Sequence, residues 1–148
     1  MWGVMGLVYN PSAVSKEDVR HWSVLLDEKY RKQVTMKDSV RDSYLVALTI
    51  LKEKKLLSEE FQKAMETTHC LTDELNDTSE QTVTKVQTIL EKMRKNSYSL
   101  ETDSGKADMV TGKVVLNMQW SGDGVYTMDE AEKDGLELSY AVPEEGSN

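Results

Sequence analysis

Cysteine and histidine are scarce in this chain, and their scarcity excludes several kinds of chemistry. The 148 residues include one cysteine, Cys70, and two histidines, His21 and His69. A single cysteine makes no disulfide within the chain and no thiolate-rich metal site, so Cys70 is interpreted as a partly buried structural thiol. The histidines are far apart in sequence and show no metal-ligand spacing. We therefore expect no catalytic residue, no bound metal and no cofactor.

Basic charge and long apolar runs are also lacking. The net charge is −8, from 26 acidic against 18 basic residues, which argues against nucleic-acid binding. No apolar run approaches the roughly 18 residues that cross a membrane, and residues 1–4 show no signal-peptide pattern. The length suits one domain with its own core, over residues 1–148.

What the chain does have is a regular alternation of apolar strands and amphipathic helices. The expected strands are 3–10, 33–36, 98–101, 113–120 and 136–142. The expected helices are a short one around Trp22, one that opens at Ser39, and then 59–77, 79–95, 104–111 and 124–133. The buried face of the helix that opens at Ser39 is expected to carry Val40, Tyr44, Ala47 or Leu48, and Leu51. This order predicts an α/β fold of three layers, with a mostly parallel or mixed sheet and helices on both faces.

The end of the strand at 113–120 is the most informative segment. The apolar run stops at Trp120, and a turn flanked by glycines follows, carrying the carboxylate of Asp123. An aromatic face beside an acid is a suitable place for a small organic cation. The alternative is a tryptophan that extends the core stripe of Val114, Leu116 and Met118, followed by a solvated turn acid.

A second acid occupies a comparable place. Residues 36–42 lead from a predicted strand into a helix, and residues 118–124 do the same. Ligands in such sheets bind beyond the carboxyl ends of the strands, where loops and helix starts converge. Asp42 would lie there, although Ser39 and Asp42 also have the spacing of a helix capping box. Both roles are compatible.

Four blocks of the sequence, taken in order, resemble one protein family. They are Trp2-Gly3 with the strand ending in Tyr9-Asn10-Pro11, residues 37–42 (KDSVRD), residues 117–123 (NMQWSGD) and residues 140–146 (YAVPEEG). Together they resemble the second lobe of the polyamine-binding proteins, the spermidine/putrescine receptors of ABC importers. The fold implied is one lobe of a type II periplasmic-binding-protein-like fold. A strand near each end with nothing to cover it likewise predicts a domain cut from something larger.

The resemblance implies a set of site residues. Trp120 matches the family's stacking tryptophan, Asp123 an acid of the putrescine-type receptors, and Asp42 a position that is glutamate in the relatives considered. Ser39 and Arg41 are neighbouring candidates. A first lobe, and a downstream segment with a further tryptophan and a ligand-binding aspartate, are absent. The chain would therefore hold about half a site.

The resemblance also implies partners and a location. The expected partners are a polyamine (putrescine or spermidine), the ABC permease and the absent first lobe, in an extracytoplasmic protein of the periplasm or cell surface. Two alternatives stay open. One is a lobe for a different small solute, such as an amine-bearing compound or a carboxylate. The other is a cytosolic interaction domain in which the Trp-x-x-Asp pattern is coincidental.

Overall fold

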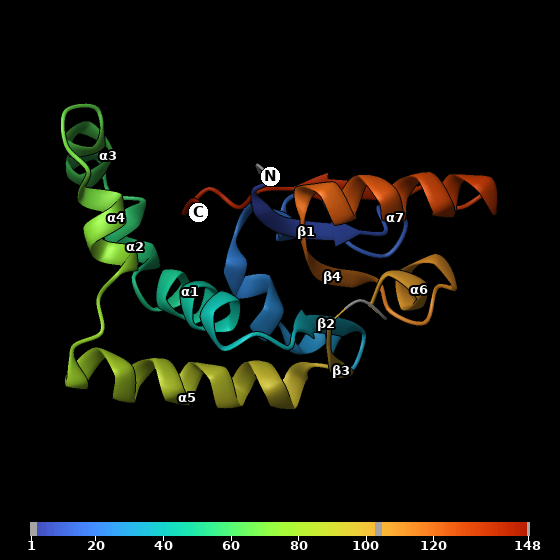
Figure 1. The fold of residues 1–148 in the computed structure, drawn as a ribbon, viewed down its shortest axis with the longest axis horizontal. Helices are drawn as coiled ribbons and strands as arrows, with labels where there is room; N and C mark the ends of the chain where they lie inside the picture. Colours follow the sequence, from blue (N-terminus) through green and yellow to red (C-terminus); the bar gives the residue numbers. More distant parts are fainter. Residues whose placement is uncertain (1–2, 103–104, 148) are drawn as a thin grey trace.

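The centre of the molecule is one mixed sheet. A computed structural model describes residues 3–102 and 105–147, so Trp2 and Ser104 lie outside the described residues. The strands follow the order β3-β2-β4-β1-β5 across the sheet (Figure 1). Their bounds are β1 (Met5–Tyr9), β2 (Val34–Lys37), β3 (Ser99–Glu101), β4 (Leu116–Trp120) and β5 (Ser139–Ala141). β2 is parallel to β3 and β4, whereas β1 is antiparallel to β4 and β5.

Helices and 3-10 turns connect the strands. The α-helices are α1 (Val40–Leu51), α2 (Glu53–Leu56), α3 (Glu59–Met65), α4 (Cys70–Leu75), α5 (Glu80–Asn96), α6 (Gly105–Val110) and α7 (Ser121–Lys133). The 3-10 turns are η1 (Asp18–Arg20), η2 (Trp22–Leu26) and η3 (Glu28–Tyr30). The short helix expected around Trp22 is therefore a 3-10 turn. Trp22 itself is almost fully buried and packs in the core with side chains of α1 and α5. Within the described residues, the structure contains no helix that is both long and apolar enough to cross a membrane.

The sheet has a core on each face, which confirms the predicted layering. On one face, Met5 and Leu7 of β1 and Met118 of β4 pack with side chains of α1, α5 and η2. On the other face, Val8 of β1 packs with side chains of α6 and α7 and of the segment before β5. Neighbouring residues of β1 thus enter opposite cores, because side chains alternate along a strand.

The prediction of one continuous helix over residues 59–77 is wrong. The segment forms two helices, α3 and α4. Between them, the hydroxyls of Thr67 and Thr68 each donate a hydrogen bond to the carbonyl of Ala64 (3.4 and 2.8 Å). Such local bonds compete with continuation of a helix. Together with α2, these helices lie away from the sheet, beyond the far end of α1 (Figure 1). The sheet therefore does not hold them in one line.

Other boundaries and positions also differ from the prediction. Val40 is 89% exposed because it is the first residue of α1, ahead of the buried stripe that includes Val46 and Leu48. The strands expected at 113–120 and 136–142 are shorter, as β4 and β5. The last helix begins at Ser121 instead of residue 124.

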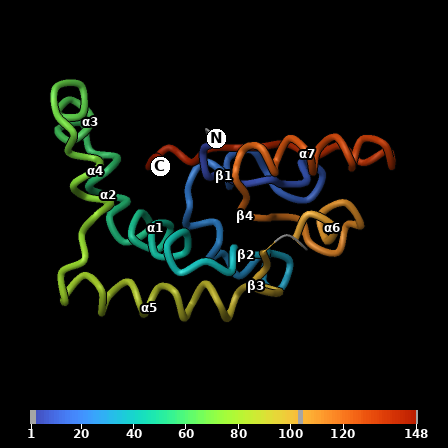
Figure 2. The backbone as a smooth tube through the Cα atoms, in the orientation of Figure 1, coloured from blue at the N-terminus to red at the C-terminus, as the bar shows by residue number. Residues whose placement is uncertain are grey.

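The two ends of the described chain lie at the same end of the strands, the edge of the sheet at which β4 finishes. β1 and β5 pair in antiparallel fashion, with Leu7 opposite Ala141, and Met5 pairs opposite Trp120 of β4. Figure 2 traces the blue first strand beside the red last segment. The residues before β1 and after β5 therefore lie near the carboxyl end of β4.

Candidate functional site

Two strand-to-helix junctions converge at this edge. β2 and β4 are parallel neighbours, so their carboxyl ends, at Lys37 and Trp120, point the same way. α1 follows the first after Ser39, and α7 follows the second directly. The ammonium of Lys37 lies 3.6 Å from a carboxylate oxygen of Asp123, which joins the two junctions. The predicted convergence of residues 36–42 and 118–124 is confirmed.

Trp120 combines the two roles considered for it. It shares the alternation phase of Leu116 and Met118 and packs against the same core, so it does extend the strand stripe. It is nevertheless only partly buried, as the last residue of β4. The backbone beside it is held by Ser121, whose N–H donates to the carbonyl of Val4 (2.8 Å). An aromatic surface is thus fixed at the strand end with part of it open.

Asp123 is not a solvated turn acid. It lies in the first turn of α7, where a carboxylate is favoured by the helix dipole. Its carboxylate contacts the ammonium groups of Lys106 (2.8 Å) and Lys37 (3.6 Å). The hydrogen bond from Lys106 holds the pKa of Asp123 below its usual range, with smaller contributions from the charges of both lysines. The acid is therefore ionised and already paired.

The start of α1 supplies the remaining predicted residues. The Ser39 hydroxyl accepts a hydrogen bond from the backbone N–H of Asp42 (3.3 Å), which makes Ser39 the N-cap. Asp42 is 8% exposed in the first helical turn. Arg41 points elsewhere, because it lines a cavity of about 470 Å³ between α1 and α4 together with Tyr44 and Leu75. Ser39 and Asp42 thus lie at the edge where the carboxyl ends of β2 and β4 meet, while Arg41 lines a neighbouring hollow.

A buried polar layer beneath the edge was not predicted. Asn117 of β4 donates to the hydroxyl of Thr35 on β2, and Thr127 of α7 donates to Gln119 (2.9 Å). These four side chains are buried on the α6–α7 face of the sheet. The signal was available, since Asn117 and Gln119 alternate with the apolar residues of β4. Lys37 and Lys106 were missed because only the fold brings them to Asp123.

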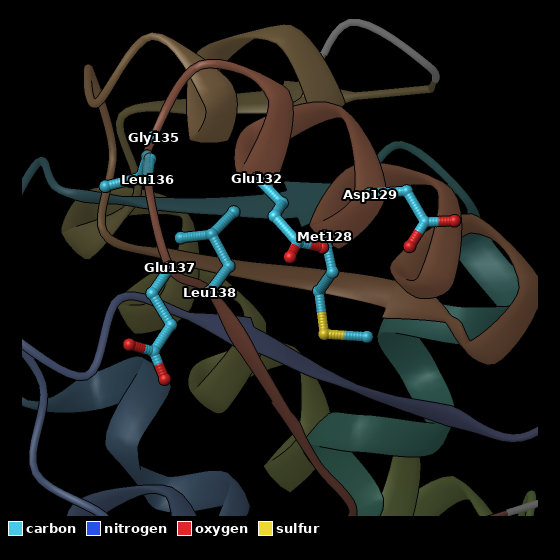
Figure 3. Close-up of a pocket in the computed structure, with 7 residues that line it drawn as sticks. All are labelled: Met128, Asp129, Glu132, Gly135, Leu136, Glu137 and Leu138. Carbon is cyan, nitrogen blue, oxygen red and sulfur yellow. The ribbon is translucent and has the colours of Figure 1, made fainter.

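A further hollow lies at the other end of α7. Figure 3 shows this cavity of about 450 Å³, with Asp129 and Glu137 on opposite sides of it. Its lining comes from the last turns of α7 and the segment before β5, whereas Asp123 is in the first turn. This hollow is therefore separate from the converging strand ends.

The fold and the position of the site together define a class of protein. A mixed sheet covered by helices on both faces, with a candidate site at its converging strand ends, is the architecture of one lobe of a periplasmic-binding-protein-like fold. The chain belongs to the family of bacterial extracellular solute-binding proteins, whose family model matches residues 2–148. No curated protein sequence matches it.

Solved structures share this fold over nearly the whole chain. The chain is similar to the spermidine/putrescine ABC transporter substrate-binding protein PotD of Streptococcus pneumoniae, with 24% identity over 99% of this chain and a TM-score of 0.76. A putative spermidine/putrescine ABC transporter protein of Listeria monocytogenes gives the same values. The lipoprotein Tp0655 (TpPotD) of Treponema pallidum is 17% identical over 95% of this chain, with a TM-score of 0.71.

The matches cover only part of those proteins. This chain spans 38% of the length of the Streptococcus and Listeria chains and 37% of the Treponema chain. A share of that size is consistent with a single lobe of a two-lobed receptor.

Proposed function

We propose that this chain is the second ligand-binding lobe of an extracytoplasmic polyamine receptor that delivers its ligand to an ABC importer. The observation that carries the proposal is the partly exposed Trp120 at the end of β4, together with an acid in the first turn of each helix that follows β4 and β2. The similarity in fold to two proteins described as spermidine/putrescine transport components supports it.

The chemistry of the edge suits a linear diammonium or triammonium ligand. The Trp120 face would pack on methylene groups or an ammonium, a contact worth about 0.5–2 kcal/mol. Each charge-assisted hydrogen bond from a ligand ammonium to Asp123 or Asp42 would add about 1.5–3 kcal/mol. A ligand ammonium is the same chemical group as the Lys106 ammonium. It would therefore compete with Lys106 for Asp123.

The remainder of the function would depend on partners. The first lobe would cover the other side of the ligand, and closure about the hinge would present the loaded receptor to the permease. The residues before β1 and after β5 lie beside the site edge, which is where such hinge crossings would leave this lobe.

A solute carrying a carboxylate is the second candidate. Lys37 and Lys106 both contact the single carboxylate of Asp123, so this part of the edge has more positive than negative charge. An anionic solute would accept hydrogen bonds from both lysines. The lysines thus favour this candidate, while Trp120 and the two acids favour the polyamine.

Calorimetric titration of the full-length gene product separates the two. For a polyamine receptor, putrescine or spermidine should bind, Asp123→Asn should weaken binding roughly ten- to a hundredfold, and Trp120→Ala about two- to thirtyfold. Lys106→Gln should strengthen polyamine binding, because it removes the competing ammonium.

The matched control is Asp129→Asn, on the same helix but at its far end, which should leave binding unchanged. An anionic solute would show the reverse pattern, with binding weakened by Lys106→Gln. Parental affinity for polyamine in both Asp123→Asn and Trp120→Ala would contradict the proposed site.

A further inference from the structure

Three side chains of types that can ligate a metal meet on the side of the lobe where the chain leaves β5. His21 precedes η2, Glu53 begins α2, and Glu145 follows β5. The Nδ1 atom of His21 lies 3.2 Å from Oε1 of Glu145 and 3.6 Å from Oε1 of Glu53. One ligand atom from each residue falls within 4.8 Å of the other two.

The second carboxylate oxygen of Glu145 is buried and lacks a hydrogen-bond partner among the described residues. The Glu145 side chain as a whole is 0% exposed. The Arg20 guanidinium nearby in sequence pairs instead with Glu17 and Glu144. Burying a carboxylate with an unpaired oxygen is costly unless a cation or a proton compensates it.

We propose that His21, Glu53 and Glu145 bind a zinc ion. Zinc takes imidazole nitrogen and carboxylate oxygen at about 2.0–2.2 Å in tetrahedral sites, which places neighbouring ligand atoms about 3.3 Å apart. The distances of 3.2 and 3.6 Å from His21 to the two carboxylates fit that spacing. Calcium and magnesium prefer all-oxygen ligands, so the imidazole selects against them.

The site is accessible from solvent on one side. The His21 and Glu53 side chains are 33% and 32% exposed, so these two ligands can be reached from solvent. The ion would join three separate segments: the start of η2, the start of α2 and the strand exit. The strand exit already meets η1 and η2, because the Glu144 N–H donates to the Arg20 carbonyl (2.8 Å) and the Trp22 indole donates to the Gly146 carbonyl (3.0 Å). Zinc would therefore stabilise the path by which the chain leaves the sheet.

The test is calorimetric titration of the chelator-treated chain with zinc chloride. All proteins carry Cys70→Ser, so that the neighbouring His69–Cys70 pair does not contribute a thiolate ligand. We expect one equivalent of zinc to bind and to raise the melting temperature by mass action. His21→Ala and Glu145→Gln should each weaken binding more than about a hundredfold, beyond the effect usual for residues that only orient ligands.

The matched control is His69→Ala, which removes the other, exposed histidine and should leave zinc affinity unchanged. His21 is partly exposed, so His21→Ala tests the site even if a change at the buried Glu145 disturbs folding. The proposal is overturned if the parent binds no zinc, if His21→Ala binds as the parent does, or if His69→Ala abolishes binding.

Discussion

Asp123 shows how the chemistry of a single residue depends on elements distant in sequence. Its position beside Trp120 was predictable from the strand pattern and the family resemblance. Its two lysine partners were not, because Lys37 ends β2 and Lys106 lies in α6. Whether the carboxylate is free or paired decides how a cation would bind. That property arises from tertiary contacts and not from the local sequence.

Glu145 gives a prediction about pH at the residue scale. Burial raises its pKa in the folded chain, so the native state binds this proton more tightly than the unfolded state. The resulting stabilisation is fully present below the unfolded pKa and is lost as the pH rises through the folded pKa. Relative to Glu145→Gln, the parent should therefore lose unfolding free energy as the pH rises above the ordinary glutamate pKa of about 4.3.

Denaturant unfolding in the presence of a chelator, at several pH values, measures this difference. Glu144→Gln is the control, because it removes a neighbouring glutamate whose carboxylate is partly exposed and pairs with Arg20. A parent that instead gains stability over Glu145→Gln as the pH rises would contradict the burial argument.

At the scale of elements, the first turn of α7 contains a matched pair of glycines. An added Cβ on Gly124 would lie 2.7–2.8 Å from ring atoms of Tyr140, whereas one on Gly122 would meet nothing within 4 Å. The Tyr140 hydroxyl is itself held by the carbonyls of Val4 and Gln119, so the ring has little freedom to move. Gly124→Ala should therefore destabilise the chain by about 1–3 kcal/mol.

Gly122→Ala should stabilise it by about 0.5–1 kcal/mol, because alanine favours the helix and has open space. Thermal and denaturant unfolding of the two variants beside the parent test the pair. Equal effects of the two substitutions would show that α7 does not pack on β5 as described.

The elements predicted best from the sequence are those whose apolar residues pack into the core. The helix expected at 79–95 is α5 at 80–96, and the strand expected at 33–36 is β2 at 34–37. The helix expected at 59–77 failed because α3 and α4 lie off the sheet, where threonine side chains compete with the backbone. Local pattern is thus reliable where burial enforces it.

At the scale of the whole molecule, the order of the strands in the sheet could not be predicted from the sequence pattern. The alternation of strands and helices indicated an α/β lobe, but not that β1 would lie antiparallel between β4 and β5. That placement brings the residues before β1 and after β5 beside Trp120. It positions the site edge next to the segments that, in the proposed receptor, would cross to the other lobe.

This arrangement predicts how the lobe should behave alone. A ligand on the isolated chain would meet Trp120 and the acids on one side and water on the other, and it would still lose its translational and rotational freedom on binding. We expect polyamine affinity at least about a hundredfold below that of the full-length gene product, corresponding to the loss of about 3 kcal/mol of contacts from the missing wall. Parallel calorimetric titrations with putrescine and spermidine measure the ratio, with circular dichroism to verify that the isolated chain is folded. Equal affinity in the two proteins would mean that one lobe holds the complete site, and the proposed binding between two lobes would be wrong.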